Sequence, residues 1–463
     1  MNIQTSETSV VIIGAGMAGL SAAEHLTQNG ITSMVVLEAA NRYGGRIHTV
    51  YFGGQKSLVE LGANWIHGGS LGNPVFNLAV QHGLLSGDIK YTEEHNGHFV
   101  TSFGSMVEKE MSKKMHGIFQ DLEKEMTCLE KYPSDTSIQE FISQREESIV
   151  QTINSDERPL VHSMFSYFKN YIEFYEGDSL ERISLRNVRD YKVFPGRNVK
   201  LPLGYISLLD VIVNSLPEGV LKLNHEVSRI NWTGPKCKVS CLNGKVFEAD
   251  HVILTVPLGV LKKKCTSMFN PSLPRQNLEA IERTGFGRVG KIFLEFERPF
   301  WKVGDLKYLH LAWDKAEWEK MKIDPNQWIA SVSGFEEVLN NPKVLLGWIA
   351  GPHSEYVEKV SDEEIIETCT TCLRRFLNDP SIPRPVRILR SKWCSDPLFG
   401  GSYSFLTPNN LPGDIDILAT PLPSVTNLRL LFAGEATHPS YFSTTHGARL
   451  SGQREASRLV SNA

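Results

Sequence analysis

Three closely spaced glycines near the start of the chain are suited to bind a phosphate group. Gly14, Gly16 and Gly19 follow the apolar run Val10–Ile13 and precede a segment with helical periodicity. A turn of this kind lets backbone N–H groups approach a pyrophosphate, and the first turn of the helix adds further donors. Glu38 ends the next apolar run, where an acidic side chain can accept hydrogen bonds from ribose hydroxyls. The spacing predicts a dinucleotide site, and a glycine-rich turn without a ligand is the alternative.

The residues that follow Glu38 favour FAD over a nicotinamide dinucleotide. Two glycines and two arginines lie within Asn41–Arg46. Small residues allow close backbone approach, and an arginine there can reach the pyrophosphate or a flavin carbonyl. A second stretch with the same glycine spacing, Gly285–Gly290, follows a helical segment and precedes a strand-like one, which reverses the required order. We interpret it as a flexible turn, so we expect one dinucleotide site.

Apolar runs at the two ends of the chain predict one buried parallel sheet. Ser33–Leu37 and Leu428–Phe432 are mostly apolar like Val10–Ile13, and we expect them to be buried strands, as in a sheet that is covered on both faces. A final helix is predicted over Gly447–Val460. The middle of the chain contains predicted helices over 105–129 and 135–174, a strand-rich stretch over 221–254, and strands over 292–296 and 343–350.

The expected fold class is α/β, with a Rossmann-like FAD-binding domain into which an α+β substrate-binding domain is inserted. A chain of 463 residues is too long for one simple core. The FAD-binding domain is predicted to be discontinuous, with residues 1–77, 199–265 and 425–463. Residues 78–198 and 266–424 are assigned to the substrate-binding domain.

The net charge, the cysteines and the lengths of the apolar runs limit which partners and which cellular location we expect. The net charge is −4, and a nucleic acid or an anionic membrane surface would require a basic patch. The seven cysteines are scattered, and the pair Cys369–Cys372 lies in a helical pattern, so we expect neither a disulfide framework nor a metal site. The apolar runs are too short for a membrane helix. Because the start is polar and Ser461–Ala463 is not a peroxisomal signal, we expect a cytoplasmic protein.

Motifs spread over nearly the whole chain resemble the flavin-containing amine oxidase family. They include Val11–Arg46, Glu60–Pro74, Gly287–Phe296 and Phe432–Ala456. Within the family, the chain is most similar to animal polyamine oxidases, which act on spermine or N-acetylated polyamines. The resemblance implies the two-domain fold of monoamine and polyamine oxidases.

The resemblance also implies which residues line the FAD. Beside the glycine turn and Glu38, these are Arg46, Gly62, Ala63, Val227, Trp393, Glu435 and Thr445. Monoamine oxidases attach FAD through a cysteine just before the last helix. Residues His438–His446 contain no cysteine, so we expect non-covalent FAD.

Two residues are expected to take part in catalysis. Lys291 opens an apolar strand, where a lysine usually extends to the surface. The resemblance instead implies that it holds a water beside the flavin and assists reoxidation by O2. His67 lies beside a glycine and would ordinarily be structural, but the resemblance implies that it faces the substrate amine. Substrate contacts are expected from His67, Trp65, Glu173, Tyr403, Tyr441 and Phe442.

The predicted function is that of an FAD-dependent polyamine oxidase. Hydride would pass from the carbon beside a secondary amine to the flavin, giving an aldehyde, a shorter amine and, with O2, hydrogen peroxide. The alternatives are a monoamine oxidase, a histone-demethylase-like oxidase, or a catalytically silent FAD-binding partner protein. The sequence does not fix the oligomeric state, which is a monomer or a dimer.

Overall fold

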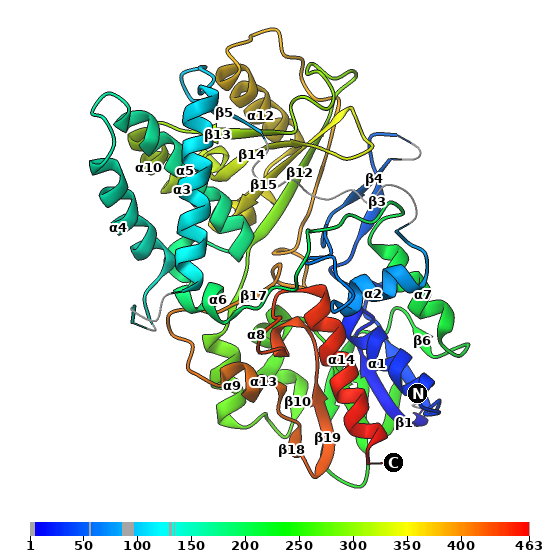
Figure 1. Ribbon diagram of the computed structural model, residues 1–463. Helices are drawn as coiled ribbons and strands as arrows, with labels where there is room; N and C mark the ends of the chain where they lie inside the picture. Colours follow the sequence, from blue (N-terminus) through cyan, green and yellow to red (C-terminus); the bar gives the residue numbers. More distant parts are fainter. Residues whose placement is uncertain (1–4, 55–56, 86–96, 129–131, 134, 463) are drawn as a thin grey trace.

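The protein consists of two regions, each built on its own sheet. The computed structural model describes residues 5–54, 57–85, 97–128, 132–133 and 135–462. Figure 1 shows the larger sheet in the lower half of the molecule, near both chain ends, and the smaller sheet in the upper half. The α/β fold class predicted from the sequence is confirmed.

The larger sheet has nine strands, and its centre is parallel. Its strands are β1 (Thr5–Ile13), β2 (Met34–Leu37), β6 (Leu221–Lys222), β7 (Val227–Asn231), β8 (Cys237–Cys241), β9 (Val246–Leu254), β10 (Phe269–Asn270), β18 (Leu422–Ser424) and β19 (Asn427–Phe432). β1 lies between β2 and β9, with Ile12 opposite Val36 and Ile253. β19, from the end of the chain, pairs in parallel with β9.

Helices cover both faces of this sheet, so the parts of its central strands that they cover, Val10–Ile13, Met34–Leu37 and Val252–Leu254, are apolar and buried. One face packs against α1 (Met17–Gln28), α2 (Pro74–Gln81), α7 (Ile206–Ser215) and α14 (Thr445–Val460). The other face packs against α8 (Leu258–Met268), α9 (Arg275–Arg283) and α13 (Asp414–Ala419). The two-sided cover explains why continuous apolar runs marked these strands in the sequence.

The smaller sheet has six strands and is mostly antiparallel. In spatial order they are β16 (Arg387–Arg390), β12 (Val289–Glu295), β15 (Val344–Ala350), β14 (Val332–Glu337), β13 (Tyr308–Ala312) and β5 (His98–Thr101). The helices of this region are α3 (Lys109–Thr127), α4 (Ile138–Gln151), α5 (Arg158–Glu176), α6 (Leu185–Asp190), α10 (Lys315–Lys322), α11 (Pro352–Val357) and α12 (Asp362–Phe376). Helix α5 packs against β13, β14 and β15, so its C-terminal end lies beside this sheet.

Two short ribbons lie outside both sheets. One is formed by β3 (Thr49–Tyr51) and β4 (Leu58–Glu60), and the other by β11 (Gly285–Phe286) and β17 (Ser404–Phe405). The second ribbon contradicts the interpretation of residues 285–290 as a flexible turn. A Cβ on Gly285 would lie 2.3 Å from the Phe405 ring, and one on Gly287 would lie 2.5 Å from the carbonyl oxygen of Gly177. These glycines allow close packing.

The predicted elements agree with the observed ones in kind but differ at their ends. The helical pattern over 135–174 is divided into α4 and α5, and the final helix begins two residues early, at Thr445. β10 and β18 pair within the nine-stranded sheet although they lie outside residues 199–265 and 425–463. The domain bounds stay a prediction. Leu129, residues 1–4 and Ala463, which entered the helix and location predictions, lie outside the described residues.

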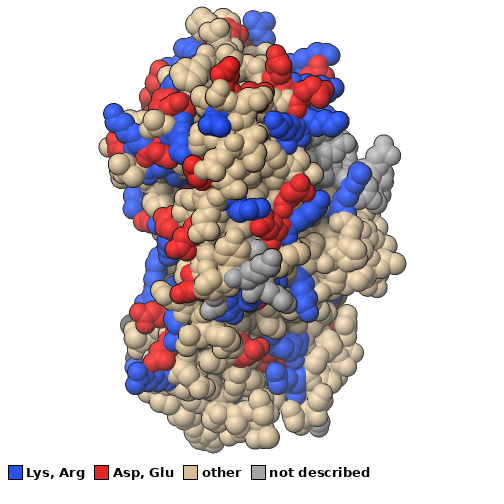
Figure 2. Space-filling view, turned by 60° about the vertical axis from the view of Figure 1, so that its left-hand side comes forward, with Lys and Arg blue, Asp and Glu red and all other residues tan. Residues whose placement is uncertain are grey.

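Acidic and basic side chains are interspersed on the face shown in Figure 2. Within the described part of the chain, no helix is both long and apolar enough to span a bilayer. All seven cysteines are free thiols. The same residues contain no cluster of His, Cys, Asp and Glu suited to a metal ion. Cytoplasmic location stays a prediction.

Gly19 should be needed for folding, because a Cβ there would lie 1.9 Å from the carbonyl oxygen of Gly14. We expect Gly19→Ala to lower the free energy of unfolding by about 1–3 kcal/mol, as overpacked sites do. Gly117 in α3 has no heavy atom within 4 Å of the same position. Gly117→Ala should instead raise stability by about 0.5–1 kcal/mol. Thermal and urea unfolding of both variants checks the contrast, which equal effects would contradict.

Candidate active site

A large pocket lies between the two sheets. Its lower part is lined by the β1–α1 turn, the end of β2, residues 44–47 and the start of β7. Its upper part is lined by the end of α5, β12, β15 and residues 393–403. Residues 61–67 and the start of α14 border both parts. The pocket is therefore formed by segments that are far apart in the sequence.

The glycine turn has the properties of a phosphate site. Gly14 has φ +106°, which only glycine adopts without strain. A Cβ on Gly16 would meet no heavy atom closer than the carbonyl oxygen of Gly44, at 3.9 Å, so protein packing does not require glycine there. Helix α1 begins without a side-chain cap and without an acidic residue in its first turn. Free N–H groups beside open space fit the pyrophosphate of FAD.

Glu38 braces this turn from the end of β2. One carboxylate oxygen accepts a hydrogen bond from the N–H of Ala15 at 2.8 Å, and the other accepts one from the N–H of Ala40 at 2.9 Å. The side chain lines the pocket and is mostly buried. This position beside the phosphate turn fits the predicted contact with a ribose.

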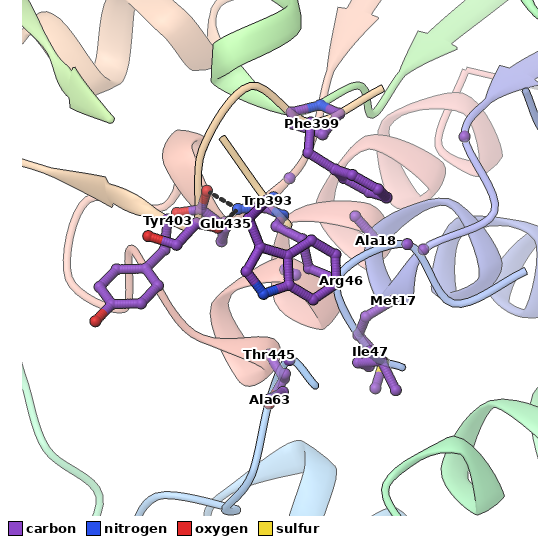
Figure 3. A pocket seen from close by; sticks show the side chains of 18 of the residues that line it. Met17, Ala18, Arg46, Ile47, Ala63, Trp393, Phe399, Tyr403, Glu435 and Thr445 are labelled. Carbon is purple, nitrogen blue, oxygen red and sulfur yellow. Dashed lines mark hydrogen bonds and ion pairs between the residues drawn. The ribbon is translucent and has the colours of Figure 1, made fainter. Parts of the chain in front are cut away.

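An ion pair joins the two ends of the chain inside the pocket. Nη1 of Arg46 lies 2.7 Å from Oε1 of Glu435, and Figure 3 shows this contact as a dashed line. Oε2 of Glu435 accepts hydrogen bonds from the backbone N–H of Ser404 and of Ser443. Glu435 thus fixes two loops around the predicted pyrophosphate and ribityl position.

The remaining predicted FAD residues also lie at the pocket. Gly62 must be glycine, because a Cβ would lie 1.7 Å from the carbonyl oxygen of Arg46. Nε1 of Trp393 donates a hydrogen bond to the carbonyl oxygen of Leu61 at 3.1 Å. This bond holds the indole beside the segment that follows β4. The remaining three predicted FAD residues also line the pocket: Ala63, Val227 and Thr445.

Lys291 is buried, with 3% of its surface exposed, so it is not a lysine that extends to solvent. Nζ donates to the carbonyl oxygens of Glu60 and Gly62, both at 2.7 Å. Residue Trp348 lies directly opposite on β15, and its ring centroid is 4.5 Å from Nζ. Burial lowers the pKa of Lys291 to about 7, while Glu60 and Glu336 oppose that shift. The group can therefore change its charge near neutral pH.

His67 lines the same pocket and is held neutral. Burial lowers the pKa of the imidazole, and a hydrogen bond with Asn198 opposes this. The ring centroid lies 6.1 Å from that of Trp65 and 6.5 Å from that of Tyr175. An uncharged imidazole can accept a hydrogen bond from an amine N–H, and it does not repel a cationic substrate.

The predicted substrate contacts divide into two groups. Trp65, Tyr403 and Phe442 line the pocket. Tyr441 does not, because its ring stacks on Phe194 with centroids 4.5 Å apart.

Glu173 also lies outside the pocket lining. Its Oε2 is 2.6 Å from Nζ of Lys322, and both groups are largely buried. A carboxylate with its own cation is not available to a charged substrate. The expected tunnel positions of Glu173 and Tyr441 are thus corrected.

The pocket residues that the sequence analysis missed include Glu176, Trp348 and Asn187. Glu176, one turn after Glu173, lines the pocket, and its Oε2 accepts a hydrogen bond from Nδ2 of Asn187 at 2.6 Å. Trp348 belongs to an apolar run that gave no functional indication. Asn187 likewise carried no recognisable motif. Only the acidic composition of residues 173–181 pointed toward Glu176, and it did not distinguish one carboxyl group from another.

Comparison with known proteins decides the family. The family described as flavin containing amine oxidoreductase matches residues 17–460. The chain belongs to the flavin-containing amine oxidases. It is 37% identical to the peroxisomal N(1)-acetyl-spermine/spermidine oxidases of Bos taurus and Homo sapiens, over 97% and 98% of this chain and 94% of each relative. It is 32% identical to probable polyamine oxidase 5 of Arabidopsis thaliana, over 97% of this chain and 98% of that relative.

A solved structure supports the fold. Putrescine oxidase bound to putrescine aligns with a TM-score of 0.73 and 20% identity, over 99% of this chain and 100% of that chain. At this identity the likeness concerns the fold alone. The family establishes that this amine oxidase uses FAD to oxidise an amine with O2.

Bound FAD would supply the acceptor for a hydride from the carbon beside the amine nitrogen and the source of electrons for O2. The glycine turn, Glu38, Arg46 and Glu435 can hold it, as their geometry fits a dinucleotide. His67 can accept a hydrogen bond from the substrate nitrogen and so favour the uncharged amine, whose lone pair is needed for oxidation. Lys291 provides a positive charge near the reacting atoms when protonated.

Gly16→Ala should weaken FAD binding without affecting the fold. The added methyl group would enter the open space of the phosphate turn and contact only the ligand. We expect at least about a tenfold loss of affinity, or about 1.4 kcal/mol. Quenching of flavin fluorescence on binding to the apoprotein measures the affinity, and the melting temperature of the apoprotein should match that of the parent. A variant that binds FAD normally would contradict the assignment of this turn.

Lys291→Met should slow reoxidation by O2 more than it slows anaerobic reduction by substrate, because it removes a cation where negative charge develops. In the parent enzyme, the lysine is protonated below its pKa of about 7. The reoxidation rate should therefore fall as the pH rises through about 7. Stopped-flow absorbance of the two half-reactions tests both statements, and equal slowing of both would contradict the role of Lys291.

Proposed function

We propose that this amine oxidase acts on polyamines, with spermine and N-acetylated polyamines as the preferred class. The proposal draws on the relatives whose names refer to polyamines. Within the chain, the observation that carries it is Glu176, a carboxyl group that lines the pocket without a basic partner among the described residues.

The electrostatics of Glu176 favour a cation. Burial raises its pKa to about 7, and the hydrogen bond from Asn187 only partly opposes this. A nearby ammonium group would lower the pKa again and stabilise the carboxylate. Glu173, one turn earlier, already has Lys322 as a partner. Of these two acids, Glu176 is thus the one available to the second nitrogen of a substrate.

Aromatic rings complete the proposed site. Trp65 and Trp348 stack with ring centroids 5.4 Å apart, and Phe174 stacks on Trp348 at 5.1 Å. Such faces pack against methylene groups and attract ammonium groups. A long substrate with alternating methylene segments and cations suits these surfaces better than a compact monoamine does. A silent binding protein would have no need for the buried Lys291 and the neutral His67.

We further propose that FAD is held non-covalently. The described residues that line the pocket include no cysteine. Cys394 lies next to the pocket residue Trp393, and burial raises the pKa of its thiol, which disfavours the reactive thiolate.

Anaerobic bleaching of the flavin tests the substrate class. Spermine, N1-acetylspermine, spermidine and a monoamine such as benzylamine are mixed with the oxidised holoenzyme, and the flavin absorbance is followed. We expect rapid bleaching by at least one polyamine and slow bleaching by the monoamine. Bleaching by the monoamine alone would contradict the proposal.

Variants of two acids refine this test. Glu176→Gln should raise the KM for the polyamine about tenfold and leave that for a monoamine nearly unchanged. Glu181→Gln is the matched control, since Glu181 is exposed and does not line the pocket. Equal effects of the two substitutions would exclude Glu176 as the anchor.

A further inference from the structure

A second cavity adjoins the Lys291 site through Glu60, whose carbonyl oxygen accepts a hydrogen bond from Nζ of Lys291. It is lined by Glu60, Asn64, Lys200, Tyr205 and Glu336, together with apolar side chains. Its lining also includes the exposed residues Pro202 and Asn340, so it reaches the surface. The substrate pocket and this cavity share one lining residue among those described, Asn64.

Asn64 forms a polar wall between the two spaces. Its Nδ2 is buried and has no hydrogen-bond partner among the described residues. A buried amide donor without a partner costs free energy unless water accepts its hydrogen bond. The neighbouring Gly62 carbonyl accepts a hydrogen bond from Lys291. Asn64 is thus two residues from a hydrogen-bond acceptor of the lysine.

Glu336 lines the cavity and is linked to Lys291 through Trp348. Its Oε1 accepts a hydrogen bond from Nε1 of Trp348 at 3.1 Å, and the ring of Trp348 faces Nζ of Lys291. The titratable groups that face Lys291 are Glu60 on β4, Glu336 on β14, and Lys200 in the segment before α7. All three line the cavity.

We propose that this cavity is the route by which solvent protons reach Lys291 during reoxidation, with Asn64 and Glu336 as its positioning residues. Reduction of O2 to H2O2 requires two electrons and two protons. The hydride taken from the amine carries two electrons and one proton, so the second proton comes from solvent.

Lys291 supplies that second proton. Its N–H bond breaks as an O–H bond forms on the reduced oxygen, and the resulting neutral amine takes a proton from water in the cavity. A lysine with a pKa of about 7 suits both transfers, because neither protonation state is strongly favoured at neutral pH. Protons can then enter while the substrate or product still fills the main pocket. The inference depends on the oxygen half-reaction and is independent of which amine is oxidised.

Glu336→Gln tests the electrostatic part. Holoenzyme titrated with dithionite to full reduction is mixed with O2, so no amine substrate is needed. Loss of the negative charge should lower the pKa of Lys291 and move the alkaline fall of the reoxidation rate by about one pH unit to lower pH. A pH titration of the flavin absorbance of the oxidised enzyme should show the same displacement of its midpoint, and Lys291→Met should abolish it.

Asn64→Leu tests the route itself. The apolar side chain should interrupt the chain of water and slow reoxidation at least about tenfold, with a larger solvent deuterium isotope effect and an unchanged absorbance midpoint. Glu337→Gln is the control, because Glu337 accepts hydrogen bonds from the backbone of Gly304 and Lys307 and does not line the cavity. It should behave as the parent enzyme does. Parent-like rates and isotope effects in Asn64→Leu, or a parent-like midpoint in Glu336→Gln, would overturn the proposal.

Discussion

The active site depends on how a buried ammonium group is stabilised. An isolated charge of this kind costs several kcal/mol to bury, and Lys291 is tolerated because two backbone carbonyls accept its hydrogen bonds. Those carbonyls belong to Glu60 at the end of β4 and to Gly62, whereas the lysine belongs to β12 of the smaller sheet. The hydrogen bonds thus tie the smaller sheet to the strand that borders the flavin site. The two regions must meet in one geometry for this charge to be accommodated.

Glu60 extends this constraint to the cofactor side. Its carboxylate accepts hydrogen bonds from the N–H of Tyr205 and from Thr49. The hydroxyl of Tyr205 in turn contacts that of Thr445, where α14 begins. One short segment therefore fixes the lysine with its backbone and the start of the last helix with its side chain. The same carboxylate, whose pKa is raised by burial, adjoins the polar cavity.

The sequence predicted the dinucleotide site well because its determinants are local. Gly14, Gly16, Gly19 and Glu38 belong to one β–α–β unit, and their contacts lie largely within that unit. The substrate side depends on contacts between distant segments. Glu173 and Glu176 are one helical turn apart, and only the position of Lys322, on another helix, determines which of them is neutralised.

Strand register and packing between distant segments account for the other differences between the predicted and the observed site. Trp348 faces Lys291 because β15 pairs with β12 in one register, which apolar composition does not reveal. Tyr441 and Phe442 are adjacent, but of the two only Phe442 lines the pocket, because Tyr441 stacks on Phe194. The glycines of residues 285–290 were taken for a turn because close packing against Phe405 and Gly177 is invisible in a single segment.

The order of segments in the larger sheet has a consequence for biosynthesis. β1 and α1 are made first, yet α14, which packs against α1, is made last, and a Cβ on Gly452 of α14 would lie 2.0 Å from the carbonyl oxygen of Ala18 in α1. While the ribosome is still translating the middle of the chain, the nascent glycine turn lacks Glu435 and the final helix. The complete pocket lining, with Glu435 and the start of α14, can therefore form only after the last segments of the chain have been made.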